Sequence, residues 1–215
     1  MSDNKIGNVL SLFDGMSCGQ IALNKLGIEY EGYYASEVDE YAIKVSKDNF
    51  PDMIHLGDVT KVNGADLPKI DLLIGGSPCQ GFSFAGKQLN FNDPRSKLFF
   101  EYVRLLHETK PRYFLLENVM MKKEYQEVIS KHLGVEPILI NSSLLSAQNR
   151  KRLYWTNIPG VGQPENLKKR LIDILEPEVD KKYFLSEKIV QGFLNKTSVF
   201  GDRFLPLKPD ESAVS

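Results

Sequence analysis

Short apolar runs alternate with segments of helical periodicity over the first two-thirds of the chain. A short apolar run bounded by turn residues predicts a strand, whereas apolar residues three and four positions apart predict a helix. Alternation of the two is typical of β-α-β units on a parallel sheet. The predicted strands are residues 9–13, 33–38, 53–56, 70–74, 112–116, 137–140 and 153–156, and the predicted helices are residues 18–26, 40–49, 96–107 and 125–132.

Three of these strands, residues 9–13, 70–74 and 112–116, are apolar almost throughout. Continuous apolar strands are expected at the centre of a sheet that is covered on both faces. The sequence therefore predicts an α/β fold with a doubly wound, mostly parallel, Rossmann-like sheet. Such sheets bind ligands beyond the carboxyl ends of their strands.

The pattern changes near residue 158, where Pro159, Gly160, Gly162 and Pro164 predict a loop. A lysine-rich helix is predicted over residues 165–175, and the remainder is weakly patterned. We therefore divide the chain into a domain over residues 1–158 and the start of an incomplete region over residues 159–215.

Composition narrows the class of protein. The 215 residues are 42% hydrophobic and 26% charged, which suits a globular domain, and the net charge of -1 requires any nucleic-acid contact to come from local clustering. No long apolar run or charged-then-apolar leader occurs, so a cytoplasmic protein without a membrane span is expected. Two cysteines indicate a reducing compartment, and three scattered histidines predict no metal site.

Polar or reactive side chains follow the predicted central strands, at the points where the strands end. They are residues 13–19, Glu37, Asp58, residues 78–79 and residues 117–118. Because the carboxyl ends of parallel strands meet at one edge of a sheet, these residues are expected to converge on a single site.

The first clusters describe a nucleoside pocket. The first turn has Gly15 and Gly19 but lacks the G-x-G-x-x-G of dinucleotide binders, and a plain tight turn explains it equally well. Glu37 stands where a carboxylate holds ribose hydroxyls, with a helix N-cap as the alternative. Asp58 suits an adenine amino group, or is a turn aspartate. A nucleoside pocket without a pyrophosphate cradle fits S-adenosylmethionine better than NAD.

The second group of clusters suggests nucleophilic chemistry. Cys79 sits in a Gly-Gly-Ser-Pro turn, which favours an exposed nucleophile over the small buried hydrophobe that cysteine often is. Glu117 ends an apolar strand, where lost solvation favours the protonated acid; an ion-paired structural glutamate is the alternative.

A basic segment follows at residues 148–152. In strand geometry Gln148, Arg150 and Arg152 share one face, because side chains alternate along a strand. Three donors on one face suit a base and a phosphate backbone, although a solvated basic turn has the same composition.

The clusters resemble, in this order, those of the cytosine-C5 DNA methyltransferases. The resemblance covers roughly residues 8–158 and rests on "SLFDGMSCG", "ASEV", "GDV", "GGSPCQGFS", "DPRSKLFFEYVRLL", "LLENV" and "QNRKRLYW". The wording is most similar to the animal de novo enzymes and to related bacterial and phage sequences. A set of motifs in this order is highly specific.

The resemblance implies a DNA (cytosine-5-)-methyltransferase that uses S-adenosylmethionine and flips its target base out of double-stranded DNA. Cys79 matches the nucleophile that adds to cytosine C6, Glu117 the acid at N3 and the exocyclic amine, and Arg152 the arginine near O2. The implied cofactor residues are Phe13, Gly15, Glu37, Val38, Asp58, Val59, Pro78 and Leu98. The implied DNA-contacting residues are Gln80, Ser83, Asn118, Gln148 and Arg150.

Two features depart from the family pattern. Val38 stands where some members carry an aromatic that stacks on adenine, and the late Gly-Asn segment that completes the cofactor pocket is missing, since the one Gly-Asn is Gly7-Asn8. A binding-only relative that holds the cofactor or a partner chain without catalysis is therefore one alternative, and a complementing carboxyl-terminal chain is an expected partner. A nucleotide-binding oxidoreductase with a redox Cys79 is the other.

Overall fold

The computed structural model describes residues 4–78 and 94–194 of the chain. It contains two units, of which the first comprises the described parts of residues 1–140 and 152–163, and the second those of residues 141–151 and 164–215. The first unit carries the sheet. Whether residues 1–158 act as a separate catalytic domain stays a prediction.

A seven-stranded sheet forms the centre of the first unit, in the order β5-β4-β2-β6-β7-β9-β8. The strands are β2 (Asn8–Leu12), β4 (Tyr33–Ser36), β5 (Ile54–His55), β6 (Ile70–Gly75), β7 (Tyr113–Val119), β8 (Ile138–Asn141) and β9 (Lys151–Thr156). The pairs from β5 to β7 are parallel, and β9 runs antiparallel to β7. The predicted doubly wound, mostly parallel sheet is confirmed.

The strand order reverses direction between β2 and β6. From β2 the chain continues outward to β4 and β5, and then returns to β6 and continues to β7. The neighbouring carboxyl ends of β2 and β6 therefore form a topological switch point, where open α/β sheets bind their ligands. A separate two-stranded parallel sheet joins β1 (Lys5–Ile6) to β3 (Glu29–Tyr30), which the sequence pattern did not predict.

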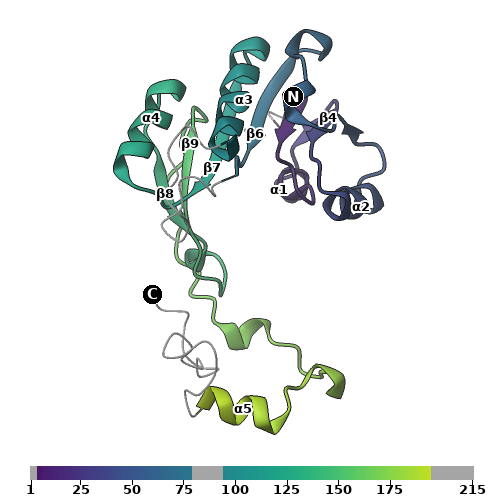
Figure 1. Cartoon of the computed structure of the whole chain (residues 1–215), viewed down its shortest axis with the longest axis vertical. Helices are drawn as coiled ribbons and strands as arrows, with labels where there is room; N and C mark the ends of the chain where they lie inside the picture. Colours follow the sequence, from purple (N-terminus) through teal and green to yellow (C-terminus); the bar gives the residue numbers. More distant parts are fainter. Residues whose placement is uncertain (1–3, 79–93, 195–215) are drawn as a thin grey trace. The chain divides into compact units, whose positions relative to one another are not determined.

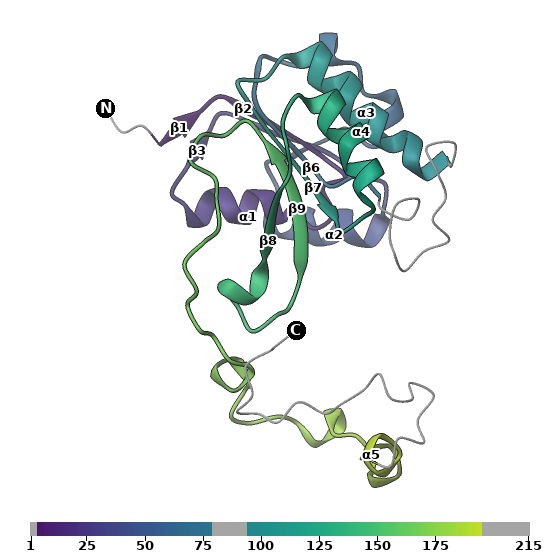
Figure 2. The ribbon, with the colours of Figure 1, turned by 90° about the vertical axis from the view of Figure 1, so that its left-hand side faces the viewer.

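Helices cover both faces of the sheet. α1 (Cys18–Lys25) and α2 (Glu40–Asn49) lie on one face, and α3 (Pro94–Thr109) and α4 (Lys123–Leu133) lie on the other (Figures 1 and 2). The larger core lies under α3 and α4, and its fully buried side chains include Leu10, Leu73, Phe99, Leu116 and Trp155. A smaller core joins Leu23 of α1 to Val9, Tyr33, Ala35, Met53 and Leu72.

Gly19 lies where α1 closely approaches the sheet. A Cβ at this position would meet the side chain of Ile74 and would lie 2.8 Å from Tyr33 Oη. Such distances lie inside van der Waals contact, so a larger residue would require these side chains or α1 to shift. The glycine therefore lets the start of α1 pack directly against the sheet.

The predicted helix over residues 165–175 is wrong. That segment is irregular apart from a short 3-10 turn over Leu171–Ile174, and Lys168 adopts a positive φ of 52°. Leu167, Ile174 and Leu175 are each more than half exposed. A short helix in water depends on an apolar face that packs against something, and here that face is unpacked.

In the second unit, the helix α5 (Glu187–Leu194) was not predicted. Within the described residues, no helix has the length and apolar character that crossing a membrane needs.

Candidate active site

A cavity of about 190 Å³ lies at the carboxyl ends of the strands in the first unit. It is lined by Phe13, Ser36, Glu37, Val38, Asp58, Val59, Pro78 and Leu98. Except for Gly15, every residue predicted to bind the cofactor lines this one cavity. Its volume is below the roughly 300–1,000 Å³ typical of whole ligand sites, so the described residues enclose space for part of a ligand.

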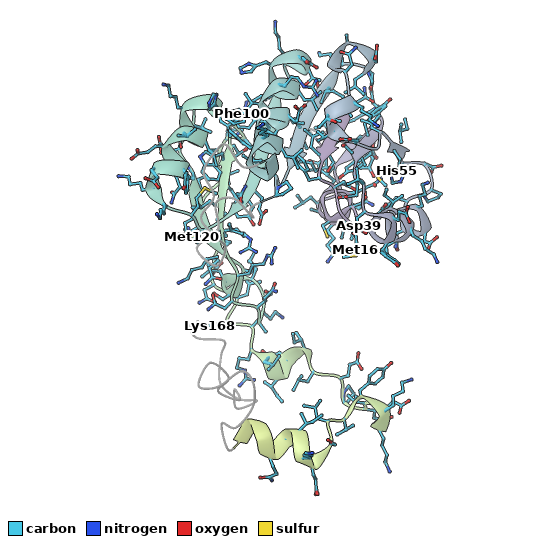
Figure 3. All side chains as sticks on the ribbon, viewed as in Figure 1. Met16, Asp39, His55, Phe100, Met120 and Lys168 are labelled. Atoms are coloured by element: carbon cyan, nitrogen blue, oxygen red, sulfur yellow. The ribbon has the colours of Figure 1, made fainter. Side chains whose placement is uncertain are left out.

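Glu37 links two of the loops at this edge. Its Oε2 accepts the backbone N–H of Gly15 at 2.8 Å, and its Oε1 accepts those of Val38 at 2.7 Å and Asp39 at 2.9 Å. In Figure 3 the labelled Met16 and Asp39 mark these two loops at the same end of the sheet. Gly15 therefore holds Glu37 in position from outside the cavity lining.

The alternative interpretation of Glu37 as a helix N-cap is wrong. The N-cap of α2 is Asp39, whose carboxylate accepts the backbone N–H of Ala42 at 2.9 Å. A carboxylate has about four acceptor positions, and backbone donors take three of those on Glu37. Acceptor capacity for a ligand hydroxyl group remains.

Asp58 begins a 3-10 turn after β5. Its Oδ1 accepts both the backbone N–H and the hydroxyl of Thr60 at 2.9 Å. The backbone hydrogen bond lowers the pKa of the carboxyl group most, and the hydroxyl bond lowers it further. Asp58 is therefore an ionised acceptor at the cavity wall. Its Oδ2 takes part in neither bond.

Ser36 lines the cavity and was missed in the sequence analysis. Its hydroxyl donates to the backbone carbonyl of Gly57 at 2.7 Å, which ties the end of β4 to the turn that carries Asp58. The signal was its place as the last residue of a strand in "ASEV", next to Glu37.

Glu117 lies within β7 and forms an ion pair with Arg152 of β9. Their Oε1 and Nε atoms are 2.7 Å apart, and the side chains are 30% and 19% exposed. Glu117 stands opposite Tyr154 in the antiparallel register, so Arg152 is its diagonal neighbour on the same face. Of the two interpretations of Glu117, the contact with Arg152 matches the ion-paired one.

Asn118 was predicted to contact DNA, and this assignment stays a prediction. The residue is only 2% exposed, and its side-chain amide donates to the hydroxyl of Ser77 at 3.1 Å and to the Ser77 carbonyl at 3.3 Å. Asn118 therefore ties β7 to the segment that follows β6. These bonds fix the backbone on the amino-terminal side of Pro78.

The basic segment does not have the predicted strand geometry. β9 begins at Lys151, so Arg152 lies on the strand while Gln148 and Arg150 precede it. In the second unit, the backbone of Arg150 donates to Asn141 Oδ1 at 2.9 Å, and the backbone of Gln148 donates to the hydroxyl of Ser146 at 3.3 Å. The strand geometry on which the predicted shared face depended therefore does not extend to Gln148 and Arg150.

Cys79, Gln80 and Ser83 lie outside the described residues. Their assignments stay predictions. Over residues 4–78 and 94–194, no cluster of three or more His, Cys, Asp or Glu side chains is arranged to hold a metal ion.

Sheet order, switch point and cavity define a Rossmann-like methyltransferase fold of the S-adenosylmethionine-dependent type. The Entamoeba histolytica methyltransferase EhMeth has this fold with a TM-score of 0.72 at 20% identity, over 87% of this chain and 66% of that one. A DNA modification methyltransferase from an Escherichia coli prophage matches with a TM-score of 0.58 at 28% identity, over 70% of this chain and 46% of that one.

The sequence of residues 7–199 matches the family model for C-5 cytosine-specific DNA methylases. The chain belongs to this family. It is 35% identical to the orphan methyltransferase M.Rho11sI of Bacillus phage rho11s, over 84% of this chain and 46% of the phage protein. It is 36% identical to the type II methyltransferase M1.ScrFI of Lactococcus lactis subsp. cremoris, over 86% and 52%. The chain thus spans about half the length of these relatives.

Proposed function

We propose that this chain carries the catalytic half of a DNA (cytosine-5-)-methyltransferase that uses S-adenosylmethionine. One observation carries the proposal: residues from four separate strand ends, singled out by their motifs, line a single cavity at the switch point. The proposed substrate is double-stranded DNA, and the proposed compartment is the cytoplasm. Family membership supports the reaction class, since the family is that of C-5 cytosine-specific DNA methylases and the curated relatives are named methyltransferases.

The donor set of the cavity fits S-adenosylmethionine. Glu37 keeps acceptor capacity for ribose hydroxyls, and the ionised Asp58 can accept from an adenine amino group. Phe13, Val38 and Leu98 supply apolar surface for the adenine ring. When bound, the cofactor would supply the methyl group as a sulfonium.

The reacting cytosine would be handled by Cys79, Glu117 and Arg152. The Cys79 thiolate would form a bond to C6, which makes C5 nucleophilic, and this bond would break again when the methylated C5 loses its proton. Glu117 would form hydrogen bonds with N3 and the exocyclic amine of the cytosine. Arg152 would donate a hydrogen bond on the O2 side. Since C6 is inaccessible in a duplex, the base must first be flipped out.

The backbone leading to Cys79 lies beside Glu117, which supports this pairing. A Cβ at Gly76 would lie 3.1 Å from Glu117 Oε2, so a larger residue there would require Glu117 to shift. Ser77 is fixed by Asn118, the residue after Glu117. The backbone of Gly76 and Ser77 therefore lies against the end of β7.

Two measurements test the proposal. Calorimetry should detect binding of S-adenosylmethionine and not of NAD, and binding of NAD alone would favour the oxidoreductase. Double-stranded DNA that contains 5-fluorocytosine should trap a covalent adduct, because the fluorine blocks the last proton loss. The adduct should be absent in Cys79→Ser.

A parent protein that binds the cofactor but forms no adduct would favour the binding-only alternative. In that case the trapping reaction should be repeated with a polypeptide corresponding to the carboxyl-terminal half of a relative such as M1.ScrFI. Adduct formation restored by this addition would support the complementing chain that we proposed from the motif pattern.

A further inference from the structure

The loop after β2 has an unusual backbone for its sequence. Phe13, Gly15 and Ser17 have φ values of 57°, 61° and 63°, so two of the three left-handed residues carry side chains. Residues with a Cβ rarely adopt this conformation, because the Cβ crowds the following carbonyl. Something in the surrounding structure must therefore hold the loop.

Asp14 lies at the centre of this loop, and its carboxylate accepts three hydroxyl groups. Oδ1 accepts from Ser11 Oγ at 2.5 Å and from Tyr33 Oη at 2.8 Å, and Oδ2 accepts from Ser17 Oγ. Its backbone N–H also donates to the Ser36 carbonyl at 3.1 Å. The carboxylate thus joins the strand before the loop, the loop itself and β4.

The donors of this network are buried. Ser11, Ser17 and Tyr33 are 3%, 0% and 2% exposed. Burial, and then the nearby Asp14 charge, raise the pKa of Tyr33 far above its ordinary range, so that its hydroxyl stays a donor. The Tyr33 hydroxyl therefore keeps its proton at neutral pH and can donate to Asp14.

Of the two residues that flank Asp14, one lines the cavity and the other bonds a residue that lines it. Phe13 lines it directly, and Gly15 donates its N–H to Glu37. Asp14 and Tyr33 do not line it. A change in the Asp14 carboxylate would therefore alter the cavity by shifting Phe13 and Glu37.

We propose that Asp14 and Tyr33 are positioning residues for the nucleoside site, and that their hydrogen bond sets the left-handed loop that orients Phe13 and Glu37. This inference rests on the proposed function, because the nucleoside is the adenosine part of S-adenosylmethionine. A purely structural role, in which the bond adds stability and nothing else, makes different predictions.

Tyr33→Phe removes the hydroxyl alone and is the main test. The affinity for S-adenosylmethionine, measured by calorimetry, should fall by about three- to tenfold, the range that corresponds to one lost hydrogen bond. Tyr102→Phe is the control, since Tyr102 of α3 is also fully buried and its hydroxyl donates to the backbone carbonyl of Leu73, at 3.5 Å. The control should keep the affinity of the parent.

A second measurement does not depend on the cofactor. Amide hydrogen exchange of Gly15 in the free protein should be about three- to tenfold faster in Tyr33→Phe and unchanged in Tyr102→Phe, because the Gly15 N–H bond to Glu37 depends on the loop. Asp14→Ala should accelerate this exchange further. If Asp14→Ala does not fold, Tyr33→Phe alone decides.

The outcomes separate the two proposals. Parent protein that does not bind S-adenosylmethionine, with Gly15 exchange still dependent on Tyr33, would refute the proposed function and leave the loop mechanism supported. Parent protein that binds the cofactor, with Tyr33→Phe equal to it in affinity and in Gly15 exchange, would overturn the positioning role. Equal losses of affinity in Tyr33→Phe and Tyr102→Phe would also overturn it, because they would reflect stability alone.

Discussion

The ion pair between Glu117 and Arg152 should couple the two residues energetically, and a double-mutant cycle would measure this coupling. The variants are Glu117→Gln, Arg152→Met and the two combined. Two unit charges about 4 Å apart interact by about 4 kcal/mol at an effective dielectric constant of about 20. Side chains that are 30% and 19% exposed lose part of this to solvent and to desolvation, so we expect a coupling of about 1–2 kcal/mol.

The assay is urea unfolding of the four proteins at neutral pH and low salt, with the coupling taken from the four free energies of unfolding. The ion pair between Lys123 and Glu127 on α4 is the control, because its atoms are 4.0 Å apart and its side chains are 88% and 65% exposed. Its cycle should give about 0.5 kcal/mol or less. A Glu117–Arg152 coupling no larger than that of the control would refute our account of the pair.

Three further predictions concern stability. Gly19→Ala should lower the free energy of unfolding by about 1–3 kcal/mol, because its methyl group would meet Ile74 and Tyr33, whereas Gly162→Ala, with no atom within 4 Å, should change it by less than about 0.5 kcal/mol; equal effects in urea unfolding would contradict this contact. Both ring nitrogens of His55 (Figure 3) are buried without a hydrogen-bond partner among the described residues. The pKa of His55 is lowered mainly by burial and then by the nearby charge of Lys47, while the charge of Asp14 acts in the opposite direction. The unfolded chain then takes up the proton first, so stability should be full above pH about 6.5 and should fall as the pH drops below it, and His55→Leu should flatten this slope in acid unfolding curves. Trp155→Phe should cost about 2–4 kcal/mol, because it leaves a cavity and removes the 3.0 Å bond from the indole N–H to Ser130 Oγ; a loss below about 1 kcal/mol would mean that the core repacks.

Where the sequence pattern coincided with burial, it predicted the fold closely. The predicted helix over residues 40–49 has the observed bounds of α2, since a capping aspartate starts it and Pro51 follows its end. The strand predicted over residues 112–116 in fact continues to Val119, because Glu117 and Asn118 still pair with β9. Pairing between strands that are distant in the sequence cannot be predicted from two polar residues, because they show no strand pattern of their own.

The candidate site was predictable in outline because strand ends in a parallel sheet must meet at one edge. Its internal bonds were not. Asp39 and Glu37 are both acidic residues just before α2, and only the coordinates reveal which one caps it. The helical spacing of Leu167, Leu171 and Ile174 matched a helix that the chain does not form, because helical spacing does not guarantee a surface to pack against.

The carboxylates of the site are held in two different ways, and the difference matches the tasks proposed for them. Glu37 accepts backbone N–H groups of Gly15, Val38 and Asp39, and Asp58 accepts the N–H and hydroxyl of Thr60. Glu117 is instead held by a side chain, that of Arg152. A cofactor site benefits from acceptors that need no rearrangement. A residue that must release its partner when a flipped cytosine enters needs a bond that can be exchanged, and the proposed reaction gives both members of the pair a new partner on the same base.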